Sequence, residues 1–230
     1  MKIASVLRQN SLRDLVPFGF QRAVWLLDQI LSSLLFRVKC LFYGVEAGSG
    51  AKVWGKVCIQ RFPGSAIQIG REVRIVSRPY RYALNIFPQS LLKTFLPSAK
   101  IILGDRVGFN SACIAARSKT IRIGNDTIIG GNCQIMDTDW HPLWPPEKRQ
   151  HNPGDEHDQG VEIGSNVFIG LNCVILKGAK IGDNSVIGAG SVVTGIIPPN
   201  SLAAGVPARV LKTFEAGEKI PREMFARHEA

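Results

Sequence analysis

The stretch from Ile163 to Val193 reads IGSNVF-IGLNCV-ILKGAK-IGDNSV-IGAGSV-V and repeats every six residues. An aliphatic residue stands at each sixth position, and four of these six residues are followed directly by Gly: Ile163, Ile169, Ile175, Ile181, Ile187 and Val193. A small or compact residue comes four positions after each of the first five: Val167, Cys173, Ala179, Ser185 and Ser191. A period of six fits neither the 3.6-residue period of an α-helix nor the alternation of a simple strand.

This period predicts a parallel β-helix, in which each hexad forms one short strand and one turn. Three hexads close one triangular coil, and successive coils stack at the usual strand separation of about 4.8 Å. The aliphatic residue of each hexad points into the prism, and the small residue sits where little interior room remains. We expect the Gly to free the backbone at the corners. One coil cannot bury its apolar face alone, so the repeats fold cooperatively.

The composition fits one large domain with extensions, since the chain has 230 residues and 45% of them are apolar. The net charge is +10 and the pI is near 9.7. Such a charge favours acidic partners: a phosphorylated cofactor, an anionic membrane surface or nucleic acid. No nucleic-acid-binding motif accompanies the charge, and we expect no nucleic-acid partner.

The five Cys residues follow no CxxC spacing. By the six-residue count, Cys113, Cys133 and Cys173 fall on the small interior position of a hexad. We therefore expect buried, reduced thiols rather than disulfides or metal ligands, and a reducing, cytoplasmic compartment. The segment Met1–Asn10 has neither the apolar core nor the small-residue cleavage site of a signal peptide.

Residues 1–43 differ from the repeats and predict an N-terminal amphipathic helix. Apolar residues recur there at intervals of three and four: Val24, Leu27, Ile30, Leu31, Leu34, Leu35, Val38, Leu41 and Phe42. Asp28 and Gln29 interrupt the segment, so we expect no transmembrane span. Two roles remain open. The helix could lie at an anionic membrane, making the protein peripheral on its inner face, or could cap the exposed strand edges at the base of the prism, and one helix could do both.

The β-helix domain is expected at residues 44–212, with excursions from the prism at 77–100 and 143–160. The first coils keep one phase of the six-residue count: Val45, Ala51, Val57, Ile69 and Ile75, with Pro63 at the same phase in one weak hexad. The first excursion carries Pro and aromatic residues, and we expect a short helix there at Gln89–Leu96. Residues 213–230 form a C-terminal tail with a short helix expected at Arg222–Arg227.

The segment MDTDWHP, Met136–Pro142, is the clearest chemical motif of the chain. An imidazole such as that of His141, beside a loop on the surface of a β-helix, can act as a general base. In an extended segment, Asp137 and Asp139 point to the same side as His141. A carboxylate next to the imidazole would fix its tautomer and raise its basicity, as in a catalytic triad. The sequence therefore predicts a catalytic group of His141, Asp139 and Asp137.

The repeats and three motifs resemble the hexapeptide-repeat acyltransferase family, in particular its galactoside and maltose acetyltransferases and its polysaccharide O-acetyltransferase branch. The motifs are TDWHP (Thr138–Pro142), IGDNSVIGAGSVVT (Ile181–Thr194) and IPPNSLAAGVPARV (Ile197–Val210), and the resemblance covers about residues 101–212. It implies a left-handed β-helix, a homotrimer with sites in the clefts between neighbouring prisms, and acetyl transfer from acetyl-CoA to a hydroxyl group. The N-terminal helix and the first excursion resemble the branch that acts on a saccharide, or a lipid-linked saccharide, in surface polysaccharide or lipopolysaccharide biosynthesis.

The resemblance also implies roles for individual residues. His141 matches the base that deprotonates the acceptor hydroxyl for direct attack on the thioester. The backbone N–H of Leu171 would stabilise the oxyanion. Asn110 and Trp140 would bind the acceptor.

The pantetheine arm of acetyl-CoA would lie beside Ala189, Thr194 and Gly195, and Arg209 would bind a phosphate of the cofactor. Two residues depart from the pattern of the family. Gly195 stands where many relatives have Lys, so one phosphate contact is missing, and Phe168 stands where many have Trp.

Three alternatives differ in kind from an O-acetyltransferase. A γ-type carbonic anhydrase shares the prism but needs three His ligands at fixed coil positions, whereas His151 and His157 lie in an irregular loop, so we expect no metal. A sugar-nucleotide N-acetyltransferase could use the same base on an amine. The third alternative is a non-catalytic β-helix binding protein. A His141→Ala variant tests it, because unchanged acyl transfer would exclude the catalytic role of His141.

Overall fold

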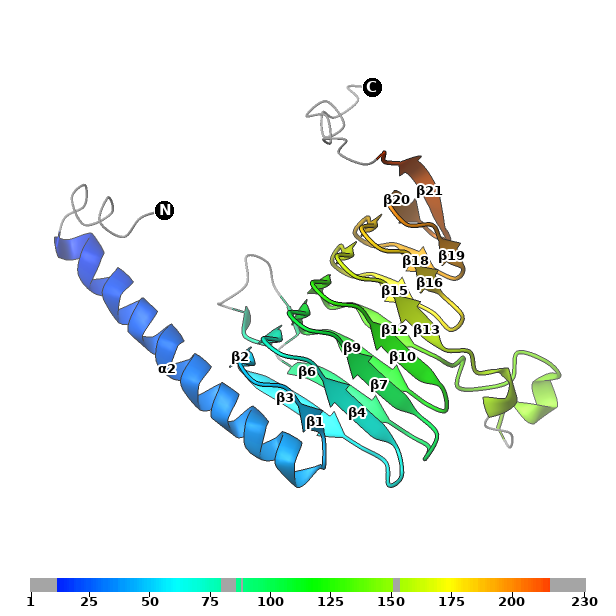
Figure 1. The fold of residues 1–230 in the computed structure, drawn as a ribbon, viewed down its shortest axis with the longest axis horizontal. Coiled ribbons are helices and arrows are strands. Elements are labelled where there is room, and N and C mark those ends of the chain that lie inside the picture. The colour runs from blue at the N-terminus through cyan, green and yellow to red at the C-terminus, as the bar shows by residue number, and fades with distance from the viewer. Residues whose placement is uncertain (1–11, 80–85, 88, 151–153, 216–230) are drawn as a thin grey trace.

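The structure is a computed structural model that describes residues 12–79, 86–87, 89–150 and 154–215. The helix predicted at Arg222–Arg227 and the first eleven residues of the N-terminal extension lie outside the described residues. The long helix α2, Leu12–Phe42, is followed by three parallel sheets that wind around one core (Figure 1). The predicted N-terminal helix and the predicted parallel β-helix are confirmed.

Each sheet takes every third strand of the chain, so three consecutive strands make one coil. Sheet A contains β1 (Glu46–Ala47), β4 (Ala66–Ile69), β7 (Lys100–Leu103), β10 (Thr120–Ile123), β13 (Val161–Ile163), β16 (Lys180–Ile181) and β19 (Ile196–Ile197). Sheet B contains β2 (Lys52–Trp54), β5 (Arg74–Val76), β8 (Gly108–Asn110), β11 (Ile128–Gly131), β14 (Phe168–Ile169), β17 (Val186–Ile187) and β20 (Ser201–Gly205), with β21 (Ala208–Thr213) antiparallel to β20. Sheet C contains β3 (Lys56–Gln60), β6 (Gln89–Thr94), β9 (Cys113–Ala116), β12 (Gln134–Met136), β15 (Val174–Ile175) and β18 (Val192–Val193).

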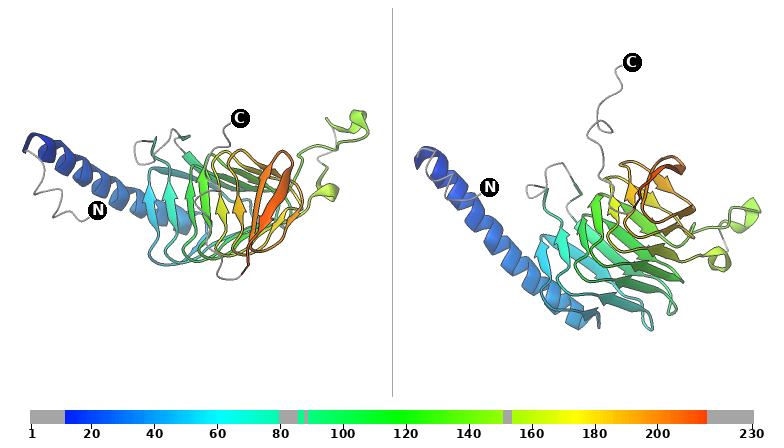
Figure 2. Two further views of the ribbon diagram at one scale, coloured as in Figure 1. Left: turned by 90° about the horizontal axis from the view of Figure 1, so that it is seen from above. Right: turned by 45° about the horizontal axis from the view of Figure 1, so that its top comes forward.

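The turns between the sheets form three edges of the prism. We call them the AB edge, the BC edge and the CA edge, after the two sheets that each turn joins. The ladder of stacked coils is visible from the side in Figure 2. Where successive turns have the same length, a side chain in one turn lies above the side chain at the same place in the previous coil, and the edge presents a row of such residues.

The core follows the six-residue pattern in the second half of the prism. The aliphatic positions from Ile163 to Val193 are at most 3% exposed, and the small positions at most 1%. Parallel pairing aligns them between coils, as Ile163 pairs with Ile181 and Ile169 with Ile187. Stacked aliphatic side chains of this kind remove apolar surface from water at about 25 cal/mol per Å², which is the main force that holds the coils together.

The repeated Gly residues have a different role from the predicted one. A Cβ added to Gly124 would lie 2.5 Å from the carbonyl carbon of Gly164 in the next coil, and a Cβ on Gly182 would lie 2.3 Å from the nitrogen of Pro199. Neither Gly has a positive φ. The left-handed conformation occurs two residues further on, for example at Asn166 (φ 55°) and Asn184 (φ 59°). Gly therefore allows the coils to approach closely, and Asn, which tolerates positive φ, makes the corner.

The predicted phase of the first coil is wrong by two residues. Ala47 pairs with Ile69, and Val53 pairs with Ile75, so Val45 occupies the small position instead of the aliphatic one. Ala51 and Val57 lie in the same way two residues before the aliphatic positions. The turn between β3 and β4 is longer than in the regular repeats, and this shifts the count.

The prediction for Cys113 is also wrong, because the turn between β8 and β9 is one residue shorter than the others. Ala112 takes the interior position, whereas Cys113 pairs with the outward-facing Gln134 and is half-buried. Cys133 and Cys173 are buried as predicted. All five Cys residues are free thiols in the described chain, and burial raises the pKa of Cys40 to about 11.

The first excursion is shorter than predicted. Residues 89–94 form β6, which pairs with β3 and β9 inside sheet C, so the helix predicted at Gln89–Leu96 is wrong. Alternate residues of this strand are buried, including Ser90 and Leu92. The second excursion begins at Asp137, directly after β12, and ends at Gly160; it projects from the prism as a separate lobe (Figure 1).

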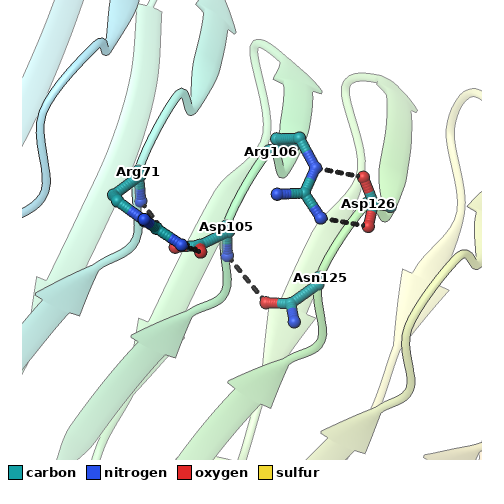
Figure 3. Close-up of polar contacts among 5 residues, drawn as sticks. All are labelled: Arg71, Asp105, Arg106, Asn125 and Asp126. Atoms are coloured by element: carbon teal, nitrogen blue, oxygen red, sulfur yellow. Dashed lines mark hydrogen bonds and ion pairs between the residues drawn. The ribbon is translucent and has the colours of Figure 1, made fainter.

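The AB edge is held together by its own polar side chains. Arg71 Nη2 lies 2.7 Å from Asp105 Oδ2, and Arg106 Nε lies 2.6 Å from Asp126 Oδ1 (Figure 3). The N–H of Asp105 donates to Asn125 Oδ1 at 2.8 Å. Hydrogen bonds from the guanidinium groups lower the pKa values of Asp105 and Asp126. This edge therefore has a structural role.

Candidate active site

The cavity that contains His141 lies between the second excursion and the stacked turns of the CA edge. Its volume is about 400 Å³. His141, Asp139 and Trp144 line it from the excursion, and Lys177 lines it from the turn after β15. His157 and Asp158 lie at the end of the excursion, where the chain returns to β13. The excursion and the stacked turns of the prism thus form the walls of one cavity.

The tautomer of His141 is fixed by the backbone. Its Nδ1 lies 2.7 Å from the carbonyl oxygen of Arg149. A carbonyl can only accept, so Nδ1 carries the hydrogen and the lone pair resides on Nε2. Within the described residues, no hydrogen bond occupies Nε2, and the imidazole is exposed at the cavity. This arrangement presents a proton acceptor to any molecule bound there.

Arg149 also fixes the shape of the excursion. Its Nη2 donates to the carbonyl of Leu143 at 2.9 Å. The backbone around Arg149 thus makes one hydrogen bond to the imidazole, and its side chain makes another to the segment that follows His141. Sequence reasoning missed this residue, because a role played by a backbone carbonyl leaves no trace in the residue type.

The predicted contact between His141 and the two Asp residues is wrong. Trp140 has a positive φ of 67°, so the segment is not extended and the alternation of side chains does not hold. Asp139 instead pairs with Lys177, with 2.5 Å between Oδ2 and Nζ. This pair joins the excursion to the CA edge and lines the cavity.

Asp137 is fully buried and holds the turn between β9 and β10. Its two oxygens accept from the backbone N–H groups of Arg117 (2.7 Å), Ser118 (3.1 Å) and Lys119 (2.8 Å). Burial raises the pKa of Asp137, while these three hydrogen bonds act in the opposite direction. Asp137 therefore anchors the start of the excursion and does not touch the imidazole.

Asp158 was not predicted and is the second buried carboxylate of this region. The Ser118 hydroxyl donates to its Oδ2 at 2.6 Å. Its Oδ1 is the one buried side-chain nitrogen or oxygen in the described chain that has no hydrogen-bond partner. Buried polar atoms without partners are rare in proteins, and they commonly indicate an ion, a water or a ligand. An isolated Asp in an irregular loop carries no sequence pattern that could have indicated this.

The other predicted residues do not meet His141 within one chain. Trp140 packs its ring against Phe95, with centroids 4.6 Å apart, and neither Trp140 nor Asn110 lines the cavity. Asn110, Leu171 and Ala189 all lie on the BC edge. Thr194 and Gly195 lie on the CA edge, as the cavity does, and Arg209 is exposed on β21.

The BC edge has the geometry expected of a backbone donor site at Leu171. Within the described chain, the N–H of Leu171 donates no hydrogen bond, while its carbonyl accepts from Gly190 at 2.8 Å. Gly130 lies directly beside this N–H, since an added Cβ would be 2.6 Å from the Leu171 nitrogen. A larger residue at position 130 would cover the donor.

Neither a metal site nor a membrane-spanning helix is found among the described residues. No group of three His, Cys, Asp or Glu side chains there is arranged to hold an ion. No helix in the described ranges is long and apolar enough to cross a bilayer.

Comparison with known proteins gives consistent results. Residues 160–195 match the family model of the bacterial transferase hexapeptide (six repeats). The chain is 43% identical over 100 residues to galactoside O-acetyltransferase of Escherichia coli, which covers 44% of this chain and 47% of the relative. It is 33% identical over 126 residues to a protein of Escherichia coli named for lipopolysaccharide biosynthesis O-acetyl transfer, covering 52% of this chain and 64% of the relative.

The chain thus spans about half of the length of the first of these relatives and more of the second. Among solved structures, an N-acyltransferase from Bacillus cereus in complex with dTDP-4-amino-4,6-dideoxyglucose and coenzyme A superimposes with a TM-score of 0.58. The two proteins are 18% identical, and the match covers 78% of this chain and 89% of that one, so it shows a shared fold. The predicted left-handed parallel β-helix is confirmed. Residues 160–195 thus match a hexapeptide-repeat family model, and the coiled domain is similar in sequence to parts of acetyltransferases with such repeats.

Proposed function

We propose that this protein transfers the acetyl group of acetyl-CoA to a hydroxyl group of a saccharide in surface polysaccharide or lipopolysaccharide biosynthesis. The observation that carries the proposal is the hydrogen bonding of His141. Its Nδ1 donates to the Arg149 carbonyl, and its Nε2 is left as a proton acceptor beside a cavity. The named O-acetyltransferase relatives supply the reaction class. The cavity and its polar lining fit a saccharide better than an apolar acceptor.

The reaction needs one base and one oxyanion site. His141 Nε2 removes the proton of the acceptor hydroxyl while the hydroxyl oxygen attacks the thioester carbonyl carbon. A backbone N–H, that of Leu171, stabilises the negative oxygen of the tetrahedral intermediate. The C–S bond then breaks, and the CoA sulfur leaves with the proton that His141 had accepted. The products are the acetylated saccharide and free CoA, so atoms and charge balance.

The distribution of these residues over two edges supports the proposal that the site forms between copies of the chain. His141 belongs to the CA edge, whereas Leu171 and Asn110 belong to the BC edge. A rotation of one prism about a threefold axis would bring the CA edge of one copy against the BC edge of the next. The AB edge, whose charged groups already pair with one another, would then face solvent. We therefore propose a homotrimer.

Acetyl-CoA would lie in the same cleft. Thr194 and Gly195 are exposed on the CA edge and Ala189 on the BC edge, so small exposed residues line both sides of the route proposed for the pantetheine arm. Arg209 is exposed on β21 and could pair with a phosphate group. The net charge of +10 favours the polyanionic cofactor. Calorimetric titration with CoA should show binding that an Arg209→Ala variant weakens.

The alternative reaction is acyl transfer to the amine of a nucleotide-linked sugar. The structural neighbour from Bacillus cereus is an N-acyltransferase, and an unprotonated His141 could serve an amine as well as a hydroxyl. The two reactions differ in their acceptors. A panel of neutral saccharides and amino sugars, tested in parallel, would distinguish them.

The direct test measures thiol release from acetyl-CoA with that panel, for the wild type and a His141→Asn variant. Loss of a general base should reduce kcat by about 100- to 10,000-fold. Binding of CoA should change little, because the imidazole is not proposed to hold the cofactor. A His157→Asn variant is the matched control, since His157 lines the same cavity and is not proposed as the base; its Nε2 lies 3.8 Å from Glu156 Oε1. We expect its kcat to fall by less than about tenfold, below the range for loss of a general base. Equal activity of the wild type and His141→Asn would exclude the proposed base.

A further inference from the structure

The outer face of α2 is a continuous apolar surface that no part of the described chain covers. Large hydrophobic side chains are exposed along it, and several are more than half exposed: Val16, Phe20, Leu27, Ile30, Leu31, Leu34, Leu35, Val38, Leu41 and Phe42. Leu41 is 85% exposed and Phe42 81%. At 1.5 Å per residue, the surface from Val16 to Phe42 is about 40 Å long. Monomeric soluble proteins rarely expose apolar patches of this extent without a function.

The opposite face of α2 already has a role in the fold. Phe36 and Cys40 are buried against the first coil, and the Ser32 and Ser33 hydroxyls accept from the N–H groups of Gly55 and Val53. Lys39 Nζ donates to the carbonyl of Val57 at 2.9 Å. The helix therefore caps the strands β1, β2 and β3. This is the second of the two roles predicted for it, that of covering the strand edges at the base of the prism. Its apolar outer face is not needed for that role.

The geometry of the helix directs the outer face away from the prism. Figure 1 shows α2 lying across the end of the prism that is opposite to β20 and β21. At 100° per residue, the positions opposite to Phe36 and Cys40 form a stripe of about 140°. Between Val16 and Phe42 that stripe contains only apolar residues, including Pro17 and Ala23.

We propose that this outer face of α2, which runs from Val16 to Phe42, docks the protein onto a lipid bilayer that contains anionic lipids. The width of the stripe favours a surface over a second helix. A coiled-coil partner uses a narrow apolar seam flanked by charged residues that form interhelical ion pairs. Here the stripe is wider than such a seam: Ile30, Leu35 and Phe42 lie toward its borders and are apolar. Charged residues begin only beyond these borders, at Asp28 and Arg37. A helix with a broad apolar face lies in the membrane interface.

The charge of the N-terminal region fits the same occupant. Residues 1–43 contain six Lys or Arg residues and two Asp residues, which gives a net charge of +4. One of the two carboxylates, that of Asp28, pairs with Arg78 at 3.0 Å. Basic residues next to an apolar helix face are attracted to anionic lipid headgroups. The apolar stripe and the basic charge thus both favour a bilayer surface with negative headgroups as the occupant.

The proposal extends the proposed function by placing the enzyme next to lipid-linked saccharides, but its test does not depend on catalysis. The full chain would be sedimented with vesicles of phosphatidylcholine mixed with phosphatidylglycerol, and with vesicles of phosphatidylcholine alone. We expect binding to the mixed vesicles, weaker binding to the neutral ones, and a decrease with added salt.

A Leu27→Gln/Leu34→Gln variant tests the face itself. Gln favours helices nearly as well as Leu, so α2 should persist, as circular dichroism would verify. We expect the affinity for mixed vesicles to fall by at least about tenfold, because two large apolar contacts are lost. The matched control is Ile196→Gln/Leu211→Gln, which makes the same kind of change at exposed positions of β19 and β21; it should bind like the wild type.

Two results would overturn the proposal. One is the absence of vesicle binding, or binding that Leu27→Gln/Leu34→Gln leaves unchanged. The other combines two observations: the wild type binds no vesicles, and light scattering without lipid shows a larger assembly for the wild type than for Leu27→Gln/Leu34→Gln. Together they would identify a second copy of the chain as the occupant of this face. Acetyl transfer to a soluble saccharide is measured separately, so a failure of the proposed reaction would not be mistaken for a failure of docking.

Discussion

The imidazole of His141 is held by a backbone carbonyl and its loop is held by a buried carboxylate. The Arg149 carbonyl selects the tautomer, and Asp137 fixes the turn from which the excursion begins. Two of the three groups that the sequence placed in one catalytic unit thus act separately. Asp137 shapes the loop and Asp139 joins it to Lys177. His141 can still act as a base without a neighbouring carboxylate. The hydrogen bond from its Nδ1 to the Arg149 carbonyl is enough to leave Nε2 as the proton acceptor.

Asp137→Asn should destabilise the protein. Its Oδ2 accepts two N–H groups and its Oδ1 one, so an amide would direct its NH₂ group at backbone donors. Leaving such buried donors unpaired costs about 1–3 kcal/mol. Denaturation by urea would measure the loss. Asp139→Asn is the control, since its side chain is 25% exposed and its ion pair with Lys177 should contribute about 1 kcal/mol. A larger effect for Asp139 than for Asp137 would contradict this assignment.

At this scale the predicted contacts of His141 were wrong, and its predicted role as a base stays a prediction. The motif around His141 indicated a base, because few residue types titrate near neutral pH and the imidazole stood beside a break in the repeats. The roles of Arg149 and Asp158 could not be predicted. They depend on how an irregular loop folds back, and one unusual backbone angle, the positive φ of Trp140, reverses the expected side-chain directions.

At the scale of the elements, each hexad meets two backbone requirements: close approach between coils at one position and a positive φ at another. The six-residue pattern alone does not tell these two positions apart. Gly directly after the aliphatic residue permits close stacking, and Asn or Gly two positions later takes the left-handed conformation. The repeats from Ile163 onward were predictable because every turn has the same length. Before them, a longer turn after β3 and a shorter one after β8 shift the phase, so Val45 and Cys113 were misplaced.

Gly182→Ala should therefore cost more stability than Gly195→Ala. The new Cβ at position 182 would lie 2.3 Å from the backbone nitrogen of Pro199, so one coil must shift. Forced repacking of this kind costs about 1–3 kcal/mol. An added Cβ at Gly195 meets nothing within 4 Å, and this residue has no positive φ. Comparison of urea midpoints would check the difference, and equal midpoints would rule out close stacking as the reason for Gly182.

The charged ladder on the AB edge should make stability depend on acidic pH. Hydrogen bonds from Arg71 and Arg106 hold the pKa values of Asp105 and Asp126 below their ordinary value of 3.8. A lowered pKa in the folded state means that the stabilisation is present above the unfolded value and is lost as the pH falls through the folded value.

We expect an Asp105→Asn/Asp126→Asn variant to have a lower Tm than the wild type at neutral pH. The difference should shrink as the pH falls below 3.8 and through the lowered pKa values of Asp105 and Asp126 in the folded state, where the wild-type carboxylates become protonated. High salt should reduce it, since the groups are exposed to solvent. Thermal unfolding across this pH range provides the measurement, and a Tm difference that persists at low pH would show that the carboxylate charges are not its source.

At the scale of the whole molecule, the proposed functions belong to different parts of the prism: its three edges and the end that α2 covers. The AB edge carries ion pairs between neighbouring coils, while the BC and CA edges carry the residues proposed for acetyl transfer. The end covered by α2 presents the apolar face proposed to meet the lipid. In a trimer with parallel prisms, the three copies of α2 would lie at the same end, so all three could rest on one planar surface. The cavity follows the fourth coil, roughly 15–20 Å from that end at the usual strand spacing.

The measurement that tests the central proposal most directly is complementation between two inactive variants. His141→Asn removes the base from the CA edge, and Asn110→Ala removes the proposed acceptor contact from the BC edge. Each variant alone should show little acetyl transfer. After joint unfolding and refolding in equal amounts, about a quarter of the sites would combine an intact CA edge with an intact BC edge from a neighbour.

We therefore predict that the refolded mixture recovers about a quarter of the wild-type activity, whereas each variant refolded alone stays inactive. Recovery would show at once that the protein transfers acetyl groups, that His141 is required and that the site is shared between copies. A mixture no more active than the separate variants, although light scattering shows mixed oligomers, would contradict a site formed by two edges.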